Sequence, residues 1–276
     1  MALWDSLEGS GNVEDRRGMN AGGLALTGVG GLVMFVAMMF LSSQGVDTSV
    51  LEQIVGSSQV AQTQTSEQPA EFAGEDSYET FAKKVLGSTT KTWSSIFEAQ
   101  GKQYAEPKLV LFRDYTPSAC GGAMGAVGPH YCPNDQTIYL DETFFAELKN
   151  QLGGSTDDVA QAYVISHEVA HAVQAQQGTL EQLDPNDNAS SVALELQADC
   201  YAGIWMYSLS RTAILEDGEI NEAISAAKAV GDDNVQQQTQ GRVTPENWTH
   251  GSSKQRVDWF NRGYKAGQVS QCNTFN

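Results

Sequence analysis

Positive charge is scarce in this chain. Its 276 residues include 16 lysines and arginines against 34 aspartates and glutamates, for a formal net charge of -18. A surface with this balance repels phosphate, which argues against nucleic acids and anionic membrane surfaces as partners. The excess acid also suits a cationic substrate, but a solvated acidic surface is the simpler interpretation.

Cysteine is also rare, with 4 in the chain: Cys120, Cys132, Cys200 and Cys272. Metal binding by these cysteines is possible, but their spacing resembles no zinc ribbon. Outside the cytoplasm they are expected to form disulfides, and three complete pairings are possible. Local pairing of Cys120 with Cys132 across a glycine-rich loop is the most economical. Cys200 with Cys272 would then hold the C-terminal tail on the helix that contains Cys200.

One long apolar run occupies residues 21–41, and no lysine or arginine occurs between Arg17 and Lys83. In a helix, about 20 residues at about 1.5 Å each span a hydrocarbon core of about 30 Å. Because Arg16 and Arg17 precede the run, the positive-inside rule predicts a cytoplasmic segment at 1–20 and an extracytoplasmic remainder. A cleaved signal peptide is the competing interpretation. The run is long for one and no small-residue cleavage site follows, which favours a retained single-pass anchor in the cell membrane.

Residues 42–75 are rich in Ser, Gln, Thr, Glu and Gly and are expected to form a flexible linker. Residues 76–276 are then one domain. Apolar periodicity and turn signals predict the following elements: helices at 78–100, 141–152, 155–178, 191–212, 219–230 and 252–266, and strands at 108–113 and 137–141. This pattern predicts an α+β domain, mostly helical with a small sheet.

Local signals refine three of these predictions. Ser155 to Asp158 resembles a capping box at the start of its helix, which Gly178 is expected to end. Ser252 is expected to cap the last helix. The acidic stretch at 232–234 lacks the spacing of a calcium loop and is expected to be solvated.

Histidine is as rare as cysteine, yet 2 of the 4 histidines stand four residues apart in a segment that reads as helix. His167, Glu168 and His171 form the pattern His-Glu-x-x-His. Four residues advance a helix by about 400°, so both imidazoles lie on one face and can bind a single Zn²⁺. Glu168, about 100° around the helix, can reach a water on that metal. The competing interpretation is a pair of helical histidines without a metal.

A catalytic zinc needs a third protein ligand. Glu195 and Asp199 are also four residues apart, in an apolar segment that reads as helix. A His-Glu-x-x-His helix followed by Glu-x-x-x-Asp resembles the thermolysin-like zincins. The resemblance implies that Glu195 is the third ligand and that Asp199 orients His167 or His171.

Over nearly its whole length the chain resembles the bacterial putative neutral zinc metallopeptidase family. The blocks that carry the resemblance are 12–17 (NVEDRR), 128–133 (GPHYCP), 164–174, 194–203 (LELQADCYAG) and 249–253 (THGSS). Members often have Gly and His where Ala170 and Ala172 stand; neither position is a ligand, and alanine favours helix. The resemblance implies a membrane-anchored zincin-like domain.

These patterns predict a zinc metallopeptidase. Zn²⁺ on the two histidines and Glu195 would lower the pKa of a bound water, and Glu168 would act as general base in an attack on a peptide carbonyl. His250, in a loop before a helix, is the first candidate to stabilise the oxyanion, and a structural role for it is equally open. Tyr131, His130 and Tyr163 are further candidates.

A peptide or protein substrate is expected to pair with the strand at 137–141, taken as an edge strand. The main alternative function is a non-catalytic, zinc-binding, membrane-anchored scaffold, whose fourth metal position a protein side chain would close. A zinc hydrolase acting on other amide or ester bonds is a third possibility.

Overall fold

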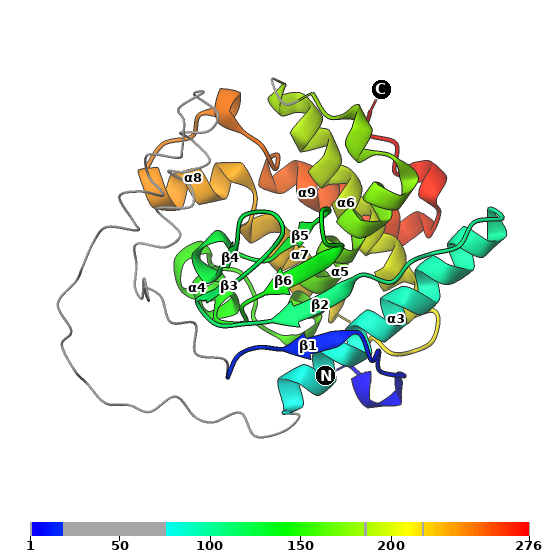
Figure 1. Ribbon diagram of the computed structural model, residues 1–276. Helices are drawn as coiled ribbons and strands as arrows, with labels where there is room; N and C mark the ends of the chain where they lie inside the picture. Colours follow the sequence, from blue (N-terminus) through cyan, green and yellow to red (C-terminus); the bar gives the residue numbers. More distant parts are fainter. Residues whose placement is uncertain (1, 19–75, 185–186, 217, 276) are drawn as a thin grey trace.

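The computed structural model describes residues 2–18, 76–184, 187–216 and 218–275 (Figure 1). They form a mostly helical α+β fold around a small mixed sheet. The strands are β1 (Val13–Asp15), β2 (Lys108–Leu111), β3 (Tyr115–Thr116), β4 (Ala123–Met124), β5 (His130–Cys132) and β6 (Thr137–Leu140). The helices are α3 (Ser77–Ala99), α4 (Phe144–Leu152), α5 (Asp158–Gln177), α6 (Asn188–Ser210), α7 (Ile220–Ala229), α8 (Asp232–Gln240) and α9 (Ser253–Ala266).

The predicted membrane helix at 21–41 and the predicted linker at 42–75 lie outside these described residues. Within the described part of the chain, none of the helices combines the length and the apolar character needed to cross a membrane.

Four strands form the main sheet in the order β1-β2-β6-β5. β2 pairs in parallel with both β1 and β6, whereas β5 pairs antiparallel to β6. The strand predicted at 137–141 is therefore internal, and the expectation that it forms an edge was wrong. The edge next to α5 is β5, which the sequence pattern missed because a three-residue strand is too short to show an alternation.

The N-terminal segment packs on the same core as residues 76–275. β1 lies beside β2 in register, with Val13 opposite Leu109. Trp4, 7% exposed, stacks on Trp205 and donates a hydrogen bond from Nε1 to Asp158 Oδ2 at 2.8 Å. A chain that crossed a membrane once between residues 18 and 76 would separate β1 from β2. This sheet and the predicted single crossing therefore exclude each other in one molecule.

Arg17 holds together the two ends of the undescribed stretch at 19–75. Its guanidinium is buried and pairs with Asp15 at 2.6 Å, Asp76 at 2.9 Å and Glu142 at 2.9 Å. Asp76 also caps α3 by accepting a hydrogen bond from the amide of Glu79. Residues 17 and 76, on either side of that stretch, are therefore neighbours in space.

Helix α5 is buried on nearly all sides, since the sheet lies against one face and α3, α6 and α7 pack on the others (Figure 1). Gly178 ends it in the left-handed region, with φ of 75°, as predicted. The predicted capping box does not form. Ser155 donates instead to Asp157, and the amide of Val159 donates to Glu222 of α7.

Helices α6 and α9 cross at glycines. A Cβ atom on Gly203 would collide with the carbonyl oxygen of Phe260, and one on Gly263 with the carbonyl oxygen of Cys200. The two backbones therefore approach more closely than side chains would permit. Ser252 caps the start of α9, as predicted, and it does so in a capping box with Gln255.

Candidate metal centre

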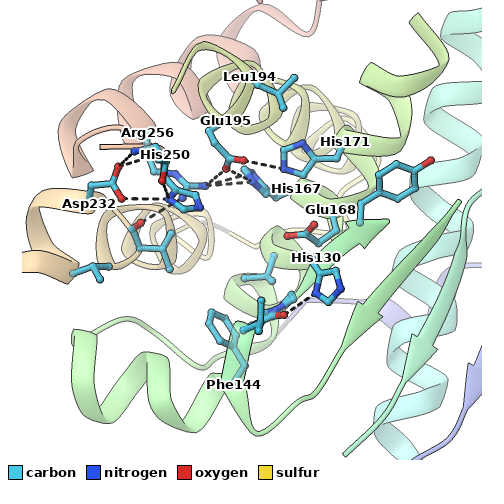
Figure 2. Close-up of a pocket in the computed structure, with 18 of the residues that line it drawn as sticks. His130, Phe144, His167, Glu168, His171, Leu194, Glu195, Asp232, His250 and Arg256 are labelled. Carbon is cyan, nitrogen blue, oxygen red and sulfur yellow. Dashed lines mark hydrogen bonds and ion pairs between the residues drawn. The ribbon is translucent and has the colours of Figure 1, made fainter. Parts of the chain in front are cut away.

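The three predicted ligands come together from α5 and α6 (Figure 2). His167 Nε2 lies 3.1 Å from Glu195 Oε2, and His171 Nε2 lies 3.3 Å from Glu195 Oε1. One ligand atom from each residue can be chosen so that all lie within 4.8 Å of one another. Two imidazoles and a carboxylate that converge in this way are a donor set that zinc accepts.

Both imidazoles are oriented through their other ring nitrogen. His167 Nδ1 lies 3.0 Å from Asp199 Oδ1, and His171 Nδ1 lies 2.8 Å from Gln174 Oε1. An oxygen acceptor at Nδ1 keeps the proton on that nitrogen and leaves the Nε2 lone pair for a metal. The sequence left open whether Asp199 orients His167 or His171, and in the structure it contacts His167.

Gln174 was not predicted to take part. Its side-chain amide is fixed because Nε2 donates to Leu194 O at 2.8 Å and to Gln197 Oε1 at 3.0 Å. These two bonds direct Oε1 towards His171. The signal in the sequence is its position three residues after His171, on the same helical face.

Asp199 is itself held by two residues from other helices. It is fully buried and accepts hydrogen bonds from Tyr163 Oη at 2.5 Å and from Arg256 Nε at 2.8 Å and Nη2 at 3.0 Å. Burial favours the neutral acid, but the charge of Arg256 and the hydrogen bond with His167 outweigh it and lower the pKa of Asp199. Arg256 comes from α9 and no local pattern indicated it.

The electrostatic environment favours positive charge between the ligands. Burial alone would lower the pKa of His167, yet its contacts with Asp199 and Glu195 raise that pKa to about 10. Burial would raise the pKa of Glu195, but its contacts with the two histidines outweigh burial and hold that pKa well below the usual range. The same attraction would act on a metal cation.

A cavity of about 550 Å³ opens onto this triad. Glu168, 7% exposed, lines the cavity and lies between the triad and His130 (Figure 2). The helix therefore presents Glu168 to the same cavity onto which the triad opens. This is the position expected of a general base.

His250 lines the cavity on the side away from His171 (Figure 2). Its Nδ1 lies 3.3 Å from Asp232 Oδ1 and 3.0 Å from Thr249 Oγ1, which leaves Nε2 for the cavity. Burial would lower the pKa of His250, but the hydrogen bond with Asp232 and the charge of Glu195 raise it. His250 is thus placed to donate to a substrate oxygen.

Asp232 was expected to be solvated, and this was wrong. It begins α8, its side chain is 14% exposed, and its Oδ2 accepts the backbone amides of Thr249, His250 and Gly251 at 2.7 to 2.9 Å. One carboxylate thereby fixes the whole loop that presents His250. Burial would raise the pKa of Asp232, but its contacts with His250 lower it.

The other candidate donors occupy different positions. Tyr163 is committed to Asp199, so it supports a metal ligand. His130 Nδ1 lies 3.1 Å from the carbonyl oxygen of Gly128, and the His130 ring stacks on that of Tyr139. Tyr131 lines the cavity from the edge strand β5.

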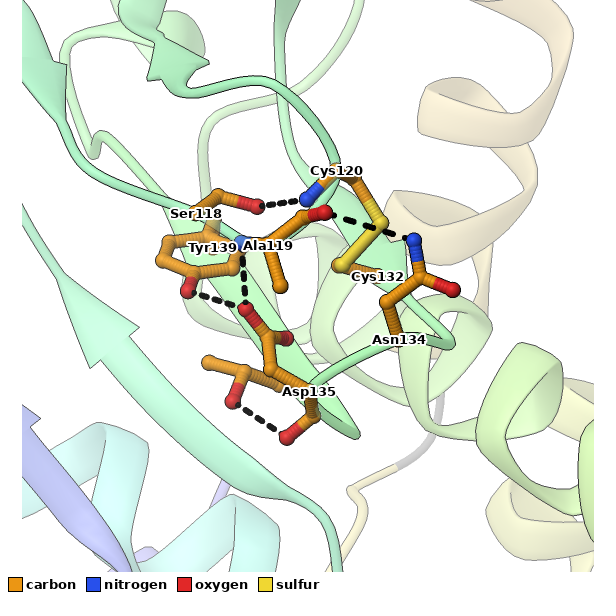
Figure 3. The surroundings of a disulfide bond; sticks show 8 residues. Ser118, Ala119, Cys120, Cys132, Asn134, Asp135 and Tyr139 are labelled. Carbon is orange, nitrogen blue, oxygen red and sulfur yellow. Dashed lines mark hydrogen bonds between the residues drawn. A yellow bond between two sulfur atoms is a disulfide. The ribbon is translucent and has the colours of Figure 1, made fainter.

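Two disulfides flank the site, with the predicted pairings. Cys120–Cys132 joins an exposed loop to β5 (Figure 3). Asp135 also holds this loop, because its carboxylate accepts hydrogen bonds from the amide of Ala119 and from Tyr139 Oη, both at 2.9 Å. Cys200–Cys272 joins α6 to the C-terminal tail.

Comparison with known proteins agrees with this centre. The family described as "Putative neutral zinc metallopeptidase" matches residues 2–275. An Escherichia coli K12 protein named "Uncharacterized protein YpfJ" is 42% identical over 287 residues, which cover 99% of this chain and 98% of that protein. The Mycobacterium bovis protein "Uncharacterized protein Mb2605" is 45% identical over 186 residues, which cover 63% of this chain and 64% of that protein. No solved structure shows a significant match. The chain therefore belongs to the putative neutral zinc metallopeptidase family.

Proposed function

We propose that this protein is a zinc-dependent metallopeptidase with a zincin-like domain. The observation that carries the proposal is the convergence of His167, His171 and Glu195 beside Glu168 at one open cavity. When bound by these three side chains, zinc would supply a Lewis acid that polarises a carbonyl and acidifies a water molecule.

The chain's own residues would carry the proton transfers. Glu168 takes a proton from the attacking water and later delivers it to the leaving amine. His250, held by Asp232, donates a hydrogen bond to the oxygen on which negative charge develops. The Asp199 and Gln174 side chains keep the two imidazoles in the orientation that metal binding needs.

The substrate backbone would align with β5. This edge strand borders the cavity through His130 and Tyr131, and an extended peptide can add to an open strand edge by main-chain hydrogen bonds. The Cys120–Cys132 bond limits the movement of that edge.

A non-catalytic zinc scaffold is the main alternative. It would need a protein side chain to close the fourth metal position. The cavity beside the triad and the presence of Glu168 in it favour the enzyme over the scaffold.

We also propose an extracytoplasmic location, which the two disulfides support. Membrane attachment through residues 21–41 belongs to the same proposal. The pairing of β1 with β2 adds a condition to it: residues 2–18 would lie on the same side of the membrane as residues 76–275.

The decisive experiment for the activity is Glu168→Gln in the full-length protein. Zinc content, measured by mass spectrometry, should stay at one ion per chain because Glu168 is not a ligand. Hydrolysis of a peptide library should fall by a factor of about 100 or more. Hydrolysis at the wild-type rate would refute the role of Glu168. Zinc binding without hydrolysis in the wild-type protein would favour the scaffold.

A further inference from the structure

The C-terminal tail that follows α9 lies along helix α6. Cys272 forms a disulfide with Cys200, and Thr274 Oγ1 donates a hydrogen bond to the carbonyl oxygen of Ala193 at 2.6 Å. Between these two points, the carbonyl oxygen of Cys272 accepts a hydrogen bond from Gln197 Nε2 at 3.1 Å. The tail therefore contacts the same helix that supplies the carboxylate ligand of the metal centre.

Gln197 connects this tail to a histidine of the metal centre. Its Oε1 accepts a hydrogen bond from Gln174 Nε2 at 3.0 Å, and Gln174 Oε1 lies 2.8 Å from His171 Nδ1. Four groups thus follow one another by hydrogen bonds, and we call them the Gln197 network: the Cys272 carbonyl, Gln197, Gln174 and His171.

The tail decides which way the amide of Gln197 points. Because a backbone carbonyl can only accept, the atom of Gln197 that faces Cys272 O is the nitrogen, and Oε1 then faces Gln174. If the amide turned over, two NH₂ groups would face each other. Gln174 would then be driven to turn as well and to present Nε2 to His171, which favours the imidazole tautomer with its proton on Nε2. That tautomer cannot bind a metal through Nε2.

Burial makes the orientation of these amides costly to change. Gln174 is 0% exposed, Gln197 7% and Cys272 1%, so water cannot readily replace a lost partner. Gln174 Nε2 also donates to the carbonyl oxygen of Leu194 at 2.8 Å. Loss of the tail contact would therefore weaken the orientation of His171 without abolishing it.

The disulfide fixes the tail where the network needs it. It joins two residues that are 72 positions apart, and both are buried in the folded protein. A reductant has little access to a bond so placed, so the disulfide acts when the protein matures and not as a reversible switch. Its formation removes two electrons and two protons from the two thiols, and a small-molecule disulfide such as oxidised glutathione accepts them and becomes two thiols.

We propose that the Cys200–Cys272 disulfide, acting through Gln197 and Gln174, positions His171, so that the protein reaches its full zinc affinity only after this bond has formed. The inference rests on the metal centre of the proposed function, which it deepens by naming the step that completes that centre. Gln197 and Gln174 are positioning residues in this scheme.

Zinc affinity of the full-length protein, measured by competition with a chromophoric chelator, provides the first test. Cys272→Ala removes the disulfide, and Gln197→Met interrupts the network while the disulfide stays. Each should lower zinc affinity about 3- to 10-fold, less than the about 10- to 100-fold expected for Gln174→Met, because Gln174 keeps its bond to Leu194. Wild-type affinity in either variant would overturn the proposal.

The double variant Cys272→Ala/Gln197→Met tests whether the two groups act along one path. It should lose no more affinity than the weaker of the two single variants, because both changes interrupt the same network. Losses that multiply would show that the disulfide and Gln197 act independently, and this would also overturn the proposal.

Gln176→Met is the matched control for Gln197→Met. Gln176 belongs to the same helix as His171, but its amide exchanges two hydrogen bonds with the backbone of Ala105, both at 2.8 Å. The variant should keep wild-type zinc affinity. A loss as large as that of Gln197→Met would show that the effect is not specific to the network.

Cys120→Ser/Cys132→Ser is the control for the disulfide, since it removes the other bond, which joins a loop to β5. It should keep wild-type zinc affinity. The same variant serves if Cys272→Ala does not fold. After reduction with a phosphine in denaturant, it is refolded with or without oxidised glutathione, so that only Cys200–Cys272 differs. Equal zinc affinity of the two refolded samples would overturn the proposal.

The position of the proton on His171 separates positioning from a general loss of stability. In metal-free protein with ¹⁵N-labelled histidine, NMR shows which ring nitrogen carries the proton. We expect Nδ1 in the wild type and in Gln176→Met, and a mixture of both nitrogens in Cys272→Ala and Gln197→Met. The same tautomer in all four proteins would overturn the proposal.

Neither zinc affinity nor the tautomer depends on peptide hydrolysis. If the wild-type protein binds zinc and cleaves no peptide, while both measurements change as expected in the variants, the peptidase proposal fails and this inference stands. If the wild-type protein cleaves peptides and the variants match it in zinc affinity and tautomer, the inference fails and the peptidase proposal stands.

Discussion

Arg256 Nε donates to Asp199 Oδ2 at 2.8 Å, although the two residues are 57 positions apart in the chain. The bond links α9 to α6 behind the metal ligands, and Asp199 in turn orients His167. Both groups are almost completely buried, so neither can exchange its partner for water. The orientation of one metal ligand thus depends on the packing of a helix that contains no ligand.

Arg256→Gln should weaken zinc binding. Loss of the arginine leaves a buried carboxylate without its counter-charge, which costs about 3–5 kcal/mol of stability and releases Asp199 from its fixed orientation. We expect zinc affinity to fall about 10- to 100-fold, measured by competition with a chromophoric chelator, and the unfolding temperature to fall as well.

Arg262→Gln is the control for Arg256→Gln, since Arg262 is an exposed residue of the same helix that stacks on Trp259. It should leave zinc affinity unchanged. Wild-type zinc affinity in Arg256→Gln would show that the bond to Asp199 does not orient His167.

Asp232→Asn should move the alkaline limb of the pH–rate profile to lower pH. The pKa of His250 is raised in the folded protein, so the imidazole is protonated below this raised pKa and loses its proton as the pH rises through it. Asparagine removes the negative charge that favours the protonated form, so the proton is lost at lower pH. The measurement is kcat/KM against pH.

Asp258→Asn is the matched control for that profile. Asp258 is exposed, pairs only with Lys254 among the contacts described, and does not line the cavity. The alkaline limb of the pH–rate profile of Asp258→Asn should coincide with that of the wild type. An unchanged limb in Asp232→Asn would mean that His250 is not the group whose deprotonation limits the rate.

Gly203→Ala should destabilise the fold by about 1–3 kcal/mol, because the added methyl forces α6 away from α9. Since α6 bears Glu195 and α9 bears Arg256, the same change should also reduce zinc affinity. Urea unfolding of the metal-free protein measures the first effect and chelator competition the second.

Gly11→Ala provides the comparison, since a Cβ at Gly11 would meet no atom within 4 Å. It should change the free energy of unfolding by less than about 0.5 kcal/mol. Equal stability of the two variants would show that α6 and α9 do not pack as closely as described.

Single cysteines at Ser6 and Lys254 should react equally with a membrane-impermeant maleimide on intact cells. Both positions are exposed, on the N-terminal segment and on α9, and the β1–β2 pairing places them on the same side of any membrane. Labelling at 254 without labelling at 6 would support the single crossing predicted from the charge pattern and would exclude that pairing.

The sequence by itself determined the features that depend on residues close together in the chain. A period of 3.6 residues placed His167 and His171 on one helical face, and Gly178 and Ser252 marked helix ends because their effects act within one turn. The choice of Glu195 and Asp199 came from the same spacing together with a family resemblance.

Only the tertiary structure decided which side chains from other elements support the metal site on α5. Arg256 and Asp232 gained their roles from contacts between α9 and α6 and between α8 and the loop that bears His250. Gln174 belongs to α5 itself, but its bonds to Leu194 and Gln197 of α6 direct it towards His171. β1 and the β5 edge were also missed, since three-residue strands acquire their pairing from the neighbours they meet. Local periodicity shows which face of a helix bears the reactive side chains, but burial and long-range packing determine which residues contact that face.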